Sequence, residues 1–130
     1  MLVCISIYLL IVLGSVLSLS PFLVRNEVKS EARKLEFSLR RAILASSHHE
    51  HDIVFSCDDH NCRANFRDNE ETIFQHRLSA AVSLSIRSSQ PNRVILYRSG
   101  TASPATLVIS NQQRECSVIL SLEARVRSTC

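Results

Sequence analysis

The first 24 residues of the chain, MLVCISIYLLIVLGSVLSLSPFLV, contain no charged side chain. After them, apolar positions recur at steps of three and four up to about Ser47, a period typical of an amphipathic helix. A helix of about 20 apolar residues spans the roughly 30 Å hydrocarbon core of a bilayer. The pattern therefore predicts one long N-terminal helix, with a transmembrane half over 1–24, an amphipathic half over 25–47, and a globular domain over 48–130.

Two other interpretations of the apolar segment stay open. A cleaved secretory signal has a basic start and a site of small residues; Ser18-Leu19-Ser20 would supply that site, but no basic residue precedes the segment and Pro21 would follow the cut. The second interpretation is that the segment forms a buried helix of a soluble protein. We expect a retained anchor, although the basic residues after it, which would hold that side in the cytoplasm, conflict with an exported domain: Arg25, Lys29, Arg33 and Lys34.

The apolar stripe of the second half-helix is expected to pack on a sheet. It consists of Val24, Val28, Ala32, Leu35, Leu39, Ala42 and Ile43. The opposite face carries Glu27, Lys34 and Arg41, which we expect to be solvated, and Glu36 with Arg40 is a favourable pair at helical spacing. Pro21 lies inside the helical pattern, where it removes one backbone hydrogen bond and is expected to kink the helix.

After Ser47 the period of the pattern changes to two, which predicts β-strands. A turn-rich tetrapeptide, Asp58-Asp59-His60-Asn61, separates the first two and indicates a hairpin; further breaks contain Gly, Pro and Asn. The fold class is therefore α+β, a long helix packed on an antiparallel β-domain. The expected strands are Ile53–Cys57, Cys62–Phe66, Thr72–Leu78, Ala80–Arg87, Arg93–Arg98, Ala105–Ser110, Cys116–Ser121 and Arg125–Thr129.

Composition narrows the function. With 130 residues, 45% of them apolar, the chain can form one domain of roughly 85 residues beyond the anchor. Two glycines and no tryptophan argue against a phosphate-binding loop and an aromatic nucleic-acid platform. The net charge of +3 is uneven: seven acids face two arginines between His48 and Glu71, and seven arginines face two acids from Arg77 to Cys130. The C-terminal part is therefore expected to be basic.

Four of the five cysteines lie in the globular part. Cys57 and Cys62 flank the predicted turn, and Cys116 and Cys130 are equidistant from a hairpin centred on Glu123, so that antiparallel pairing brings each pair within reach of a bond. Disulfides there imply an oxidising compartment. Two alternatives stay open: the four cysteines could pair in another connectivity, or they could be reduced, buried thiols of a domain on the cytoplasmic side.

No motif predicts catalysis. No serine or cysteine lies in a nucleophile elbow, and turns explain the adjacent carboxylates Asp58-Asp59 and Glu70-Glu71. The segment 48–52, His-His-Glu-His-Asp, has zinc-type ligands near Cys57, His60 and Cys62, but its spacing fits no established pattern, so a solvated loop with a disulfide is preferred. We predict no enzyme, no metal and no cofactor.

Four segments, taken in order, match one known family. Cys4–Val12 aligns with the start Phe-Thr-Leu-Ile-Glu-Leu-Leu-Ile-Val, Leu39–Ser46 with Leu-x-x-Ala-Arg-Ser-Glu-Ala, Ser99–Leu107 with Gly-x-x-x-Pro-Gly-Thr-Leu, and Ala124–Arg127 with Gly-Arg-Val-Arg. Nearly the whole chain thus resembles the GspH/FimT family of minor pseudopilins and type IV pilins. The chain departs from that family in having Tyr8 in place of the buried glutamate, in the early position of its proline, and in lacking a basic leader before Cys4; an upstream start codon would restore the leader and resolve the orientation conflict.

The resemblance implies a pilin-like subunit of a type II secretion system or type IV pilus, anchored by a single pass in the inner membrane with its globular domain in the periplasm. Its partners would be other major and minor pseudopilins, inner-membrane lipid and secreted cargo. The alternative is a DNA-binding minor pilin for natural transformation, with Arg125, Arg127 and Arg114 in a basic hairpin. The residues expected to form the seam with lipid or with other pilin helices are Tyr8, Leu9, Leu10, Ile11, Val12, Leu13, Val16, Leu17 and Pro21.

Overall fold

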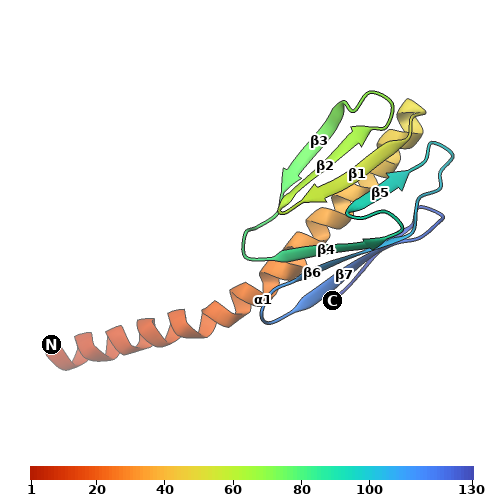
Figure 1. The fold of residues 1–130 in the computed structure, drawn as a ribbon. Coiled ribbons are helices and arrows are strands. Elements are labelled where there is room, and N and C mark those ends of the chain that lie inside the picture. The colour runs from red at the N-terminus through yellow and green to blue at the C-terminus, as the bar shows by residue number, and fades with distance from the viewer.

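In the part of the chain that the computed structural model describes, residues 1–18 and 26–130, the protein consists of one long helix and a head of eight β-strands (Figure 1). The helix, α1, runs from Leu2 to His49. Its first half projects from the head, and its second half lies along the sheets (Figure 1). The predicted α+β class, with a long N-terminal helix packed on antiparallel sheets, is confirmed.

The second half of α1 packs on the sheets through the stripe that the sequence predicts. Its buried members, Val28, Ala32, Leu35, Leu39 and Ala42, are at most 1% exposed, and Ile43 is partly buried. Val24 lies outside the described residues. The helix ends where the next residue, Glu50, adopts the left-handed conformation with φ 57°, a common way to terminate an α-helix.

The first sheet has the strand order β3-β2-β1-β5, and all its pairs are antiparallel. Its strands are β1 (Ile53–Asp58), β2 (Asn61–Phe66), β3 (Thr72–Arg77) and β5 (Arg93–Leu96). The predicted hairpin joins β1 to β2 and places Cys57 opposite Cys62.

The second sheet has the order β4-β6-β7-β8 and is also antiparallel. Its strands are β4 (Ser83–Ser88), β6 (Ala105–Ser110), β7 (Glu115–Leu120) and β8 (Val126–Thr129). Side chains alternate along these strands, as expected for a sheet with one face on a core. The inward face of β6, for example, is formed by Ala105, Leu107 and Ile109.

One hydrophobic core joins α1 to both sheets. Its largest fully buried side chains come from the helix (Leu35, Leu39), the first sheet (Ile53, Phe55, Leu96) and the second sheet (Leu107, Ile109, Leu120). Because a small head has little apolar area to bury, the loss of any of these side chains is expected to be costly.

Two disulfides close hairpins at the predicted cysteine pairs. Cys57 is bonded to Cys62 across the β1–β2 turn, and Cys116 to Cys130 across the β7–β8 hairpin. The register explains the second bond, because Ser117 pairs with Thr129 and the next opposed positions are Cys116 and Cys130. Cys4 is a free, exposed thiol on the projecting helix.

Two details of the head differ from the sequence prediction. The strand expected from Ala80 begins only at Ser83, because the chain turns at 79–82, where the Val82 amide donates to the Ser79 carbonyl oxygen. Glu27, expected on the solvated face, is partly buried, and its carboxylate accepts a hydrogen bond from the Ser79 hydroxyl. The alternating apolar pattern of 80–86 is thus used only in part as a strand.

Within residues 1–18 and 26–130, no helical stretch combines the length and the hydropathy that a membrane crossing requires. Residues 19–24 of the predicted transmembrane half lie outside the described residues. The predicted kink at Pro21 lies there too.

Candidate functional site

The projecting half of α1 exposes nearly all of its apolar side chains. From Leu2 to Leu17, the large ones are 42–82% exposed. The predicted seam residues are among them: Tyr8, Leu9, Leu10, Ile11, Val12, Leu13, Val16 and Leu17. They lie around the whole helix and not along one stripe, so this segment presents apolar surface in every direction.

The three serine hydroxyls of this segment donate hydrogen bonds within the helix. The hydroxyls of Ser6 and Ser15 donate to the carbonyl oxygens of Leu2 and Ile11, at 2.9 and 2.8 Å. The Ser18 hydroxyl donates to the Ser15 carbonyl oxygen at 2.9 Å. Because a polar group without a partner is costly in an apolar surrounding, these bonds make the segment compatible with lipid or with packed helices.

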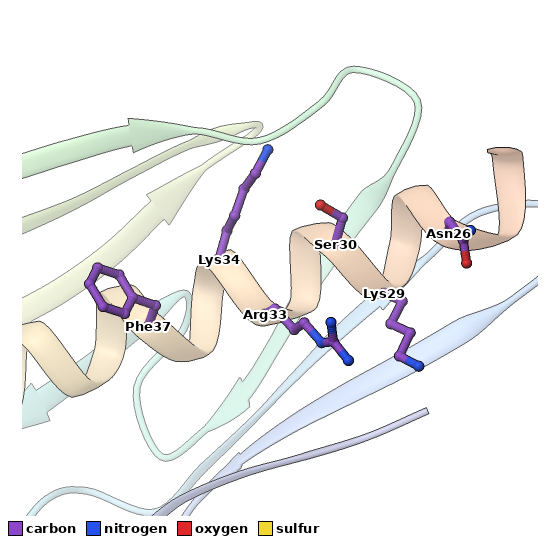
Figure 2. A pocket seen from close by; sticks show the side chains of 6 residues that line it. All are labelled: Asn26, Lys29, Ser30, Arg33, Lys34 and Phe37. Atoms are coloured by element: carbon purple, nitrogen blue, oxygen red, sulfur yellow. The ribbon is translucent and has the colours of Figure 1, made fainter.

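Basic side chains surround α1 at the base of the head. Asn26, Lys29, Ser30, Arg33, Lys34 and Phe37 line an open hollow of about 560 Å³ (Figure 2). Figure 2 shows Lys29 and Arg33 extending to one side of the helix, with Ser30 and Lys34 on the other. No acidic side chain lines the hollow.

A second hollow, of about 270 Å³, extends the basic surface to the second sheet. Lys29 and Arg33 line it together with Arg114, from the turn between β6 and β7, and the C-terminal residues Ser128 and Cys130. We call Lys29, Arg33, Lys34 and Arg114 the basic collar. Lys29 and Arg33 form no ion pair with another residue in the described part of the chain, whereas Lys34 pairs with Glu31 at 2.9 Å and keeps 59% of its side chain exposed.

The arginines proposed for DNA binding lie in two places. Arg125 and Arg127 lie at β8, where Arg125 is 83% exposed and pairs with Glu123 at 3.3 Å. Arg114, a member of the basic collar, lies at the other end of the β7–β8 hairpin. The strand register places Arg127 not with Arg114 but in a row with Arg87 of β4. The row crosses the second sheet from Arg127 through Ile119 and Thr106 to Arg87.

The segment 48–52, which contains the candidate metal ligands, lies at the far end of the head, where α1 ends. The β2–β3 turn is held to it by a hydrogen bond from the Arg67 backbone amide to the Asp52 carbonyl oxygen, and by a 3.3 Å contact between His51 Nδ1 and an Asp68 carboxylate oxygen. Cys57 and Cys62 are bonded to each other and so are not available as thiolates for a metal. The described residues contain no cluster with metal-binding geometry.

A half-buried histidine, His76, joins the edge strand β3 to α1. The Ser38 hydroxyl lies within hydrogen-bond distance of the Lys34 carbonyl oxygen and of Nδ1 of His76, at 2.9 Å from each. Nε2 is buried without a partner. Burial lowers the pKa of the His76 imidazole, while the Glu31 carboxylate acts to raise it and the Lys34 ammonium adds to the lowering.

Sequence reasoning missed a carboxylate that organises the base of the head. Glu31 is only 4% exposed and accepts hydrogen bonds from Lys34 Nζ and from the Ser79 amide. Ser79 also donates its hydroxyl to Glu27 at 2.5 Å. The only signal in the sequence was the position of Glu31 next to the apolar stripe residue Ala32, because its partner is 48 residues away.

The fold is that of minor pilins and pseudopilins. The minor pilin FimU of Pseudomonas aeruginosa matches with a TM-score of 0.69 at 14% identity, over 81% of this chain and 90% of that one. The minor pseudopilin EpsH of the Vibrio cholerae type 2 secretion system matches at 0.64 and 16% identity, over 79% and 96%. GspH of E. coli matches at 0.57 and 14% identity, over 80% and 88%.

Sequence comparison adds nothing to this likeness. No protein-family model matches the chain. No curated protein matches it either. At 12–16% identity the solved structures establish the fold, which agrees with the one implied by the sequence resemblance.

Proposed function

We propose that the protein is a minor pseudopilin of a type II secretion system or type IV pilus, which takes part in assembly of the filament or in its tip. The observation that carries the proposal is the continuous helix whose apolar half projects from a pilin-like head. Such a helix needs an apolar partner along its length, and lipid or the helices of other pilins would supply one.

The proposed location is the inner membrane, with a single pass over residues 1–24 and the head in the periplasm. Two disulfides support an oxidising compartment for the head. In this proposal the subunit rests in the bilayer and is then moved into a filament, exchanging lipid contacts for helix contacts of similar apolarity.

Tyr8 sets this subunit apart from the family pattern. A carboxylate within the membrane requires a partner, and in the resembled family a glutamate stands where this chain has Tyr8. The exposed phenol of Tyr8 carries no such requirement. We therefore propose that the subunit packs by the shape of its apolar helix, without a buried ion pair at this position.

Membrane extraction of a charged variant tests the proposal. Leu13→Arg places a charge in the projecting helix, at a cost of about 2.5–3.5 kcal/mol near a bilayer centre. We expect the wild-type protein to stay in the membrane pellet at alkaline pH and the variant to be largely released. Leu44→Arg, at a position 70% exposed on the head-bound half, serves as the control and should stay in the pellet. Recovery of the intact wild-type protein as a soluble cytosolic species would refute the proposal.

A DNA-binding role is the second candidate, favoured by the outward row that contains Arg127 and Arg87. Phosphate contacts by such residues would give an affinity that falls steeply with salt. Arg125→Ala with Arg127→Ala should abolish a salt-dependent mobility shift, while Arg93→Ala with Arg98→Ala, which lie outside the second sheet, should not. Equal loss in both double variants, or no shift at all, would refute this role.

A further inference from the structure

We propose that the basic collar binds the phosphate groups of anionic phospholipids, at the surface of the bilayer from which the head protrudes. This inference rests on the membrane insertion proposed above. It adds a lipid specificity and an orientation of the head that insertion alone does not require.

The first argument is position along α1. At a rise of about 1.5 Å per residue, Lys29 lies only about 7 Å beyond the end of the uncharged segment at Val24. The headgroup layer on each side of a bilayer is about 5–8 Å thick. Side chains on a helix lean toward its N-terminus, and long basic side chains extend toward the membrane surface. The ammonium of Lys29 therefore falls among the headgroups, and the Arg33 guanidinium can reach them.

The second argument is the excess of basic side chains at the collar. No Asp or Glu side chain lines either hollow; besides basic, hydroxyl and amide groups, the lining includes Phe37, Ala32 and the terminal residue Cys130. Lys29 and Arg33 lack ion-pair partners within the described residues, and the carboxylate that pairs with Lys34 is only 6% exposed. Ser30 and Asn26 add neutral hydrogen-bond donors to the larger hollow (Figure 2). This set of donors suits the oxygens of a phosphate.

The third argument is the charge at the opposite end of the head. The exposed acids there, Glu50, Asp68, Glu70 and Glu71, lie where α1 ends, about 30 Å along the helix from Lys29. An anionic surface attracts the collar, and it repels the acidic end when a tilt of the head brings that end within about a Debye length, roughly 8–10 Å. The head is therefore favoured with its basic base against the membrane. An acidic protein or nucleic acid would also find the collar attractive, but only a membrane surface is continuous with the apolar half of the same helix.

Lipid retention tests the inference with the full-length protein. The protein is placed in bilayers of phosphatidylcholine with one quarter phosphatidylglycerol and extracted in mild detergent, and the co-purifying lipids are measured by mass spectrometry. We expect the ratio of phosphatidylglycerol to phosphatidylcholine among the co-purifying lipids to be about five times the ratio in the bulk bilayer, since one basic residue near an anionic surface contributes about that factor. The enrichment should fall to the bulk ratio in Lys29→Gln with Arg33→Gln, and in 0.5 M salt.

The control removes the same charge elsewhere. Arg93→Gln with Arg98→Gln, at the first residue of β5 and two residues beyond its last, should keep the enrichment. Retention after alkaline extraction is measured for every variant, so that insertion and lipid preference are separated.

Normal insertion with no enrichment, or equal enrichment in the collar variant, would overturn this inference and leave the proposed function standing. Loss of wild-type insertion would overturn both. Binding of DNA or an acidic protein that depends on Lys29 and Arg33, without any lipid preference, would assign the collar to that partner instead.

Discussion

At the scale of single residues, polar side chains between α1 and the head fix how the two fit together. Glu31 and Ser79 join the helix to the β3–β4 turn, and Ser38 and His76 join it to the edge strand β3. These contacts could not be predicted from the sequence because their partners are 38 and 48 residues apart, and a local pattern carries no information about them. Such groups make stability depend on protonation as well as on packing.

His76 is expected to make the head sensitive to mild acid. Because burial lowers the pKa of the folded imidazole below its ordinary value of 6.5, the unfolded chain binds more protons than the folded one between these two pKa values. The contribution to stability is therefore complete above pH 6.5 and is lost as the pH falls toward the lowered pKa. Urea unfolding at several pH values should reveal this slope in the wild type and a flatter one in His76→Gln. Parallel curves for the two proteins would contradict it.

At the scale of elements, the helix and most strands could be predicted because their patterns are local. The stripe from Val28 to Ala42 has a helical period, and the Asp58–Asn61 turn marks the first hairpin. The start of β4 could not be predicted from the sequence. Ala80 and Val82 continue the alternating pattern of a strand, but the contacts of Ser79 make the chain turn there. The division into two four-stranded sheets was also not predicted, since strand order depends on pairing between distant segments.

A matched pair of leucines tests the packing of α1. Leu39 is fully buried and Leu44 is 70% exposed on the same helix. Leu39→Ala should lower the free energy of unfolding by about 2–5 kcal/mol, because it removes buried methyl groups and leaves a cavity. Leu44→Ala should change it by less than about 0.5 kcal/mol. Similar losses in denaturant unfolding for both variants would contradict the burial assigned to this helix.

The two disulfides should differ in their effect because they close loops of different length. The Cys116–Cys130 bond spans 14 residues and the Cys57–Cys62 bond spans five. By loop-closure entropy, Cys116→Ser with Cys130→Ser should lower stability by about 3 kcal/mol, and Cys57→Ser with Cys62→Ser by about 2 kcal/mol. Thermal unfolding of each double variant measures this order. A larger loss of stability in the Cys57→Ser, Cys62→Ser variant would contradict the explanation by loop-closure entropy.

At the scale of the whole molecule, the chain is divided between a projecting apolar half-helix and a head of two sheets with two disulfides (Figure 1). The charges follow the same axis, with the basic collar at the base of the head and the exposed acids at its far end. The sequence showed the collar only as basic residues after the uncharged N-terminal segment, because Arg114 is brought to them by the fold. In the proposed function, this division would let the subunit exchange lipid for other pilin helices along its apolar half.

Site-specific crosslinking in the native host tests this account most directly. A photoreactive residue replaces Leu10, 70% exposed on the projecting half, and in a control replaces Leu44, equally exposed on the half bound to the head. The account predicts light-dependent adducts between the Leu10 position and other pilin-like subunits, which disappear when the assembly ATPase is inactive, with weaker adducts at Leu44. Adducts at Leu10 only with soluble cytosolic proteins, or none with pilin-like subunits, would contradict it.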